Sequence, residues 1–150
     1  WMSAFTIQNR LNNPSSSNTP SFVADTVKTG TSSSAVYLTK PIILENNSKA
    51  LDIRLTANIR STSEVVMYYR VSGTDNDNQL DDLSWTPFNT DGSPDATITP
   101  AEDDTTFKEY KYSASDINDF TSFQLKIVMK GSNSSYPPVL RDMRGIALAV

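Results

Sequence analysis

Strict alternation of apolar and polar side chains is the feature that most constrains this chain. Every second residue from Leu51 to Ile59 is apolar. The residues between them are Asp52, Arg54, Thr56 and Asn58. A period of two places the apolar side chains on one face of a β-strand, whereas a helix would distribute them around its axis. We therefore predict a strand here with one buried face and one hydrated face.

Further segments have strand character, because they are rich in β-branched and aromatic residues or alternate in the same way. They are residues 5–9, 36–44, 64–72, 107–112, 123–129 and the C-terminal run 139–150. In the last run, Val139 and Met143 have one parity, whereas Ile146 and Leu148 have the other. A β-bulge at Gly145 would restore a single buried face, and glycine tolerates a bulge.

Polar turn sequences separate these strands. They are residues 45–48, 73–78, 90–94 and 131–135. We find no convincing amphipathic helix, although residues 115–120 have the character of one helical turn capped by Ser115. Short strands joined by polar loops predict an all-β fold, an antiparallel β-sandwich or barrel.

The N-terminal part differs in composition from the rest. Residues 12–34 are dominated by Ser, Thr, Asn and Pro, which is typical of a linker or an extended surface arm. We place a boundary there, with a short strand and arm in residues 1–34 and the β-sandwich domain in residues 35–150. The chain of 150 residues is long enough for one domain with a real core.

Composition argues against several classes of function. The chain has no Cys and no His, which removes disulfides, thiolate metal sites and the usual catalytic triad. A formal charge of −4 with scattered Lys and Arg argues against nucleic acid as a partner. No apolar run approaches the roughly 18 residues of a membrane span, so we expect no membrane partner. We predict that the chain is not an enzyme.

An acidic loop is the one candidate for a cofactor, Ca²⁺. Its oxygen-bearing side chains include Asp75, Asp77, Asp81 and Asp82. Calcium prefers six to eight oxygen ligands in a flexible loop. However, Leu80 occupies the position at which a calcium loop has its turn glycine, and no closing Glu follows. The alternative is a solvated hairpin loop, in which Asp and Asn favour turn conformations.

Three aromatic residues are candidates for stacking on sugar rings: Trp85, Tyr136 and Tyr68. Tyr136 precedes two prolines in a polar loop and is the best candidate for an exposed ring. The alternative for Trp85 is that it covers one end of the core together with Phe88, as large aromatic residues usually do. A second acidic run, residues 102–104, offers paired carboxylates of the kind that glycosidases use, and it is the basis of the weakest hypothesis, a glycan-cleaving enzyme.

Several motifs together resemble a known family. VMYYRVS (residues 66–72), a polar loop and WTPF (85–88) resemble the strand–loop–Trp hairpin of discoidin-like, galactose-binding-type jelly rolls. FQLKIVM (123–129) and PPVLRDMRGIAL (137–148) resemble their last two strands. With YLTKPI (37–42) upstream, the order also resembles modules of tail and baseplate structural proteins of contractile-tailed phages, particularly those of marine cyanobacteria.

This resemblance implies a discoidin-like jelly-roll sandwich that serves as a virion structural protein in a phage tail or baseplate, or as a capsid decoration. Its partners would be other virion proteins in an oligomer, with strand edges and the N-terminal arm as the interface. The alternative is a carbohydrate-binding module for a host surface glycan, with Trp85, Tyr136 and the 75–82 loop forming a calcium-supported site. The family's sugar-binding residues lie on variable loops, so none is transferred to this chain.

Overall fold

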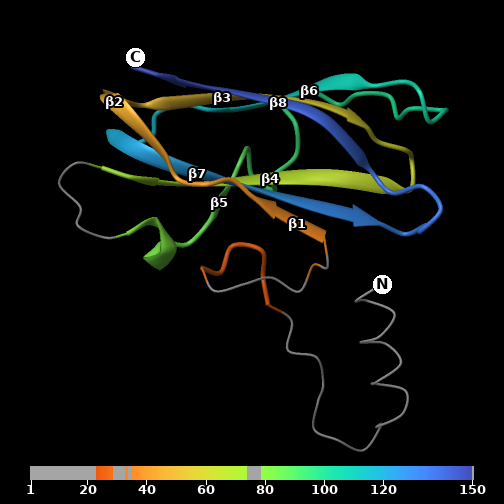
Figure 1. Ribbon diagram of the computed structural model, residues 1–150, viewed down its shortest axis with the longest axis horizontal. Coiled ribbons are helices and arrows are strands. Elements are labelled where there is room, and N and C mark those ends of the chain that lie inside the picture. Colours follow the sequence, from red (N-terminus) through yellow and green to blue (C-terminus); the bar gives the residue numbers. More distant parts are fainter. Residues whose placement is uncertain (1–22, 29–32, 34, 74–78, 150) are drawn as a thin grey trace, which may run out of the picture.

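A computed structural model describes residues 23–28, 33, 35–73 and 79–149 of the chain. Two antiparallel sheets pack face to face (Figure 1), which confirms the prediction of an all-β antiparallel sandwich. Within the described residues, no helix has the length and apolar character that crossing a membrane would require. The strands are β1 (Ala35–Leu38), β2 (Ile42–Ser48), β3 (Ala50–Asn58), β4 (Ser63–Ser72), β5 (Thr86–Pro87), β6 (Lys108–Ala114), β7 (Phe120–Gly131) and β8 (Val139–Leu148).

The larger sheet has the order β1-β7-β4-β5, and β2 also pairs with β7. Its centre is the long β4–β7 pair, which runs in register from Ser63 opposite Gly131 to Ser72 opposite Ser122. β1 and β2 follow one another along the free side of β7, so together they form one edge of this sheet. On the other side of β4, the described strand that pairs with it is β5, which is only two residues long.

The edge formed by β1 and β2 was predicted as one strand over residues 36–44, but it is two strands. Pro41 lies at the break, and proline has no N–H to donate to a sheet. Thr39 bridges the gap, because its N–H donates to the Leu125 carbonyl and its Oγ1 accepts from the Leu125 N–H, both at 3.0 Å. The turn predicted at residues 45–48 is instead part of β2.

The smaller sheet has the order β6-β3-β8. The alternating apolar residues of β3 are buried as predicted, and they face the larger sheet. The bulge in β8 is real but lies at Arg141, because Asp142 pairs with Thr56 and Leu140 with Ala57. The prediction of a bulge at Gly145 is therefore wrong: Gly145 pairs regularly with Ile53.

The reason lies in which face of β8 is buried. Residues paired with the buried β3 side chains face the core, so Met143, Gly145 and Ala147 point inward. Ile146 and Leu148 point outward and are exposed despite their apolar character. A local pattern cannot reveal that the larger side chains of a strand are the solvent-facing ones.

Aromatic residues fill the centre of the sandwich. Phe88 lies between Tyr69 and Tyr112, with ring centroids 4.9 and 6.0 Å away in edge-on geometry. The predicted helical turn at residues 115–120 is absent, since Asp116 has a φ of 57° and Phe120 already begins β7. In the described residues the one helical turn is a 3₁₀ turn, η1 (Leu80–Asp82).

Candidate functional site

Four of the residues predicted for ligand or metal binding lie around the outer face of the larger sheet. Trp85 and Tyr68 form an apolar cluster there with Val66 and Val128, separate from the main core. Asp81 and Asp82 lie in the adjacent turn η1. We call this group the outer cluster. The Trp85 side chain is only 4% exposed, so its ring has no free face for a sugar in this arrangement.

Two cations flank the aromatic rings of the outer cluster. The Arg70 guanidinium lies 4.3 Å from the Trp85 ring centroid, and the Lys126 ammonium lies 5.5 Å from it. Burial lowers the pKa of both Arg70 and Lys126, because the charged forms lose hydration. The Arg70 guanidinium is compensated by hydrogen bonds to Gln124 at 2.7 Å and to the Asp81 carboxylate at 2.8 Å.

Residues 23–28 cover the outer cluster, and we call them the strap. The Lys126 ammonium donates to the Asp25 carbonyl at 2.6 Å, and the Trp85 N–H donates to the Thr26 carbonyl at 2.8 Å. The Asp25 carboxylate accepts from the Tyr68 hydroxyl at 3.4 Å and pairs with Lys130 at 3.2 Å. Figure 1 shows this orange-red segment beneath the larger sheet. The strap thus supplies hydrogen-bond acceptors for the Lys126 ammonium and for the backbone amide of Trp85.

The acidic residues proposed for calcium are engaged differently from a calcium loop. Asp81 pairs with Arg70, and Asp82 lies 3.6 Å from the Lys28 ammonium of the strap. Asp75 and Asp77 lie outside the described residues. Among the residues that are described, no group of three or more potential ligand side chains is placed to hold a metal ion. Calcium binding therefore stays a prediction.

Tyr136 lies in the loop between β7 and β8 and is exposed. The Arg60 guanidinium, from the loop between β3 and β4, lies 4.7 Å from its ring centroid. Of the three aromatic rings proposed to stack on sugars, only that of Tyr136 is open to solvent here. The structure does not bring it into the outer cluster, and carbohydrate binding stays a prediction.

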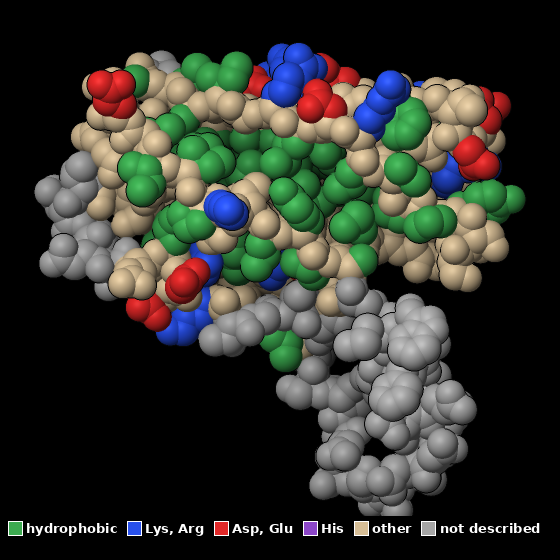
Figure 2. All heavy atoms as spheres, viewed as in Figure 1, with side chains coloured by type: hydrophobic (Ala, Val, Ile, Leu, Met, Phe, Trp, Pro, Cys, Tyr) green, Lys and Arg blue, Asp and Glu red, His purple; other side chains and the backbone are tan. Residues whose placement is uncertain are grey.

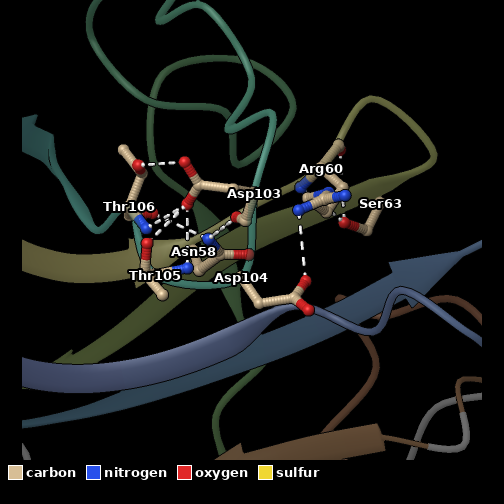
Figure 3. Close-up of polar contacts among 7 residues, drawn as sticks. All are labelled: Asn58, Arg60, Ser63, Asp103, Asp104, Thr105 and Thr106. Carbon is tan, nitrogen blue, oxygen red and sulfur yellow. Dashed lines mark hydrogen bonds and ion pairs between the residues drawn. The ribbon is translucent and has the colours of Figure 1, made fainter.

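The second acidic run organises a loop (Figure 3). The Asp103 carboxylate accepts hydrogen bonds from the backbone and side chains of Thr105 and Thr106, at 2.7–2.9 Å. These bonds favour the charged form and lower the pKa of Asp103 to about 2. The Asn58 amide donates to the Asp103 and Thr106 carbonyls, both at 2.7 Å, and Asp104 pairs with Arg60 at 3.1 Å. Loop geometry accounts for these carboxylates without a substrate.

A second surface lies at strand edges, which the sequence analysis expected as an interface without naming its residues. It is the open side of the sandwich between the β1–β2 edge and the β8 edge, which we call the seam. Seven of the nine exposed large apolar side chains in the described residues lie on these three strands. They are Tyr37, Leu38, Ile42, Ile43, Val139, Ile146 and Leu148. Figure 2 shows hydrophobic side chains along the hollow between the two sheets.

The seam contains a groove of about 300 Å³ that reaches the core residues Leu55 and Ile127. Tyr37 pairs with Ile127 and therefore points toward the smaller sheet, yet it is 51% exposed. Ile42 pairs with the buried Phe123 and is 38% exposed. Both are open because the smaller sheet ends at β8. The sequence signal was weak. The edge strands have apolar residues at both odd and even positions, and a search for strands with one buried face does not detect that pattern.

No protein-family model, curated protein or solved structure matches this chain. The fold and its surfaces define the class, an antiparallel β-sandwich module with a covered outer cluster and an open apolar seam. Since a sandwich supports many functions, the function has to be argued from these surfaces.

Proposed function

We propose that this chain is a structural module of a phage virion, in the tail or baseplate or as a capsid decoration, and that it acts through protein–protein contacts and not by catalysis. The observation that carries the proposal is the seam. Seven exposed apolar residues lie on the strands that border it, and two of them, Tyr37 and Ile42, face the hollow between the two sheets. Exposed apolar surface beside a groove is typical of interaction sites in proteins.

Exposed apolar surface favours binding of a partner because its hydration is unfavourable. Covering apolar surface contributes roughly 25 cal/mol per Å². Ile43 is 83% exposed, and the groove beside Tyr37 opens directly onto core side chains. A protein partner that filled the seam would remove this surface from water and would also cover two strand edges, which otherwise invite uncontrolled pairing.

The strap adds a second support. Asp25 and Thr26 hold it against the outer face of the larger sheet. We expect the Ser-, Thr- and Asn-rich sequence that precedes it to serve as an arm across a neighbouring subunit. The virion context itself comes from the order of the motifs in residues 37–148, which resembles phage tail and baseplate modules.

Immuno-electron microscopy of phage particles that carry this gene tests the proposal. Antibodies against residues 35–150 are expected to label the tail, the baseplate or the capsid surface. Particles in which the gene is deleted are the negative control. Complementation in trans is expected to restore the label. Absence of the chain from intact particles and from their disassembled components would contradict the proposal.

The same complementation system tests the seam. The double variant Tyr37→Ser with Ile43→Ser is expected to fold but to be incorporated poorly, because the partner loses apolar contact area. Tyr136→Ser is the matched control, since it removes an exposed aromatic side chain from the β7–β8 loop, outside the strands of the seam. Equal incorporation of both variants would show that the seam is not the contact surface.

A further inference from the structure

We propose that the partner of the β8 side of the seam is a second copy of this chain, docked by antiparallel β8–β8 pairing about a twofold axis at Met143. Two smaller sheets of three strands each would then form one continuous six-stranded sheet. This inference rests on the proposed function and names one partner of that surface.

The first argument is that the sandwich has room for another strand beside β8. In the described part of the chain β8 pairs only with β3, so its other edge is free along ten residues. Tyr37 and Ile42 point toward this side of the smaller sheet and are not covered by it. A strand added at the free edge would lie over them, and strand addition is a common mode of protein association.

The second argument is the charge pattern, which selects the register. Residues directly opposite in an antiparallel pair face the same side, so a twofold axis passes through a residue and not between two. An axis at Met143 places Asp142 of each copy opposite Arg144 of the other. An axis at Arg144 would place two guanidinium groups opposite each other, which is unfavourable.

The third argument is the bulge. Arg141 is the extra residue in β8, so beyond Asp142 the pairing continues with Leu140 opposite Gly145 of the other copy. Val139 then faces Ile146 of the other copy. Both are exposed apolar residues in the single chain, and each would gain an apolar neighbour. Charge and apolar pattern are thus self-complementary in this register.

The charged pairs determine register and specificity, while the strand hydrogen bonds and the apolar contacts stabilise the dimer. In the single chain, the carboxylate of Asp142 lies 3.5 Å from the Nε of Arg144. The Arg144 guanidinium also pairs with Glu109 at 2.7 Å. Both Asp142 and Arg144 remain more than half exposed, so each can accept an intermolecular partner. Exposed ion pairs contribute little individually, but a like-charge pair at the same place disfavours pairing.

Analytical ultracentrifugation of the full chain over a range of concentrations tests the proposal. The parent chain is expected to form a dimer. Arg144→Asp and Asp142→Arg alone each place like charges opposite one another twice per dimer, and each is expected to weaken dimerisation by about tenfold or more. The double variant D142R/R144D restores opposite charges and is expected to restore the dimer. An equimolar mixture of the two single variants is expected to form a heterodimer.

Lys111→Glu is the matched control. It lies on β6, the other edge of the same sheet, and also loses an ion pair, with Asp52 at 3.2 Å. It is expected to dimerise like the parent chain. Thermal unfolding of every variant checks that the fold is retained.

A parent chain that is monomeric at all concentrations, or a dimer that is unaffected by both single charge reversals, would overturn this inference. The virion proposal fails separately, since it depends on the presence of the chain in particles. A monomeric chain that is incorporated into particles contradicts only the dimer, and a charge-dependent dimer of a chain absent from particles contradicts only the virion role.

Discussion

The guanidinium of Arg70 lies over the ring of Trp85, with its central carbon 4.3 Å from the ring centroid. The ring is also within reach of the Lys126 ammonium, at 5.5 Å. This arrangement lies outside the sandwich core, on the far face of the larger sheet, and the strap closes over it. The molecule therefore has a second buried layer, and its stability can be tested separately.

Replacing Trp85 tests that layer directly. Trp85→Ala is expected to lower the free energy of unfolding by about 3–5 kcal/mol, because it leaves a cavity and removes the surface on which two cations pack. Urea denaturation measures the effect. Tyr136→Ala, an exposed ring that also contacts an arginine, is expected to cost less than about 1 kcal/mol. A similar loss in both variants would contradict the assignment of Trp85 to a buried layer.

Removing the carboxylate of Asp25 tests the strap. Asp25→Ala is expected to cost about 1–2 kcal/mol, since Tyr68 and Lys130 lose their acceptor at this site. Release of the strap would also free residues 23–28 to adopt the extended conformation that a protease binds, so tryptic cleavage after Lys28 is expected to accelerate. Asp104→Ala, which removes an exposed carboxylate paired with Arg60, is the control. An unchanged rate of cleavage at Lys28 in Asp25→Ala would argue against the strap.

Tyr68 predicts a loss of stability in alkali. Burial, together with the nearby Asp25 charge, raises its pKa from 10.0 to about 12. The unfolded chain therefore releases this proton at lower pH than the folded chain. The contribution of Tyr68 is complete below pH 10 and is lost as the pH rises through about 12. The free energy of unfolding measured across this range is expected to fall less steeply in Tyr68→Phe, and an identical slope would contradict this prediction.

Asp103 predicts a loss of stability in acid, with the opposite sign. Its pKa is lowered from 3.8 to about 2 by hydrogen bonds from Thr106 and Thr105. Its contribution is present above pH 3.8 and is lost as the pH falls through about 2. Urea midpoints measured through this range are expected to vary less in Asp103→Asn than in the parent chain. Equal variation in both proteins would show that Asp103 does not hold this loop.

Gly92 is expected to resist substitution. It has a φ of 87°, and an added Cβ would lie 3.1 Å from both the Met67 carbonyl oxygen and the Val66 Cβ. Gly92→Ala is expected to destabilise the protein by about 1–3 kcal/mol through backbone strain and crowding. Gly131→Ala is the control, because the nearest atom would be at an ordinary contact distance of 3.5 Å. Thermal unfolding compares the two, and a smaller loss for Gly92→Ala than for Gly131→Ala would refute the strain.

The candidate surfaces were only partly predictable. Trp85, Tyr68 and Asp81 were selected for their chemistry, and the structure does bring them close together, but around a buried network with Arg70 and the strap. The partners of that network are up to 101 residues apart in sequence, as for Lys126 and Asp25. No local pattern reports which segment covers a polar face. The residues of the seam were missed for the same reason, since the exposure of Tyr37 depends on where the opposite sheet ends.

The sequence by itself determined β3 and the all-β class, because the alternation of side chains is a local property that repeats every two residues. Leu51, Ile53 and Leu55 identified a buried face before any partner strand was known. Only the tertiary structure decided which face of β8 is buried, where its bulge lies, and which apolar side chains remain open. Those outcomes depend on pairing between distant strands and on the different widths of the two sheets. The sequence of a single strand does not specify which strands lie beside it.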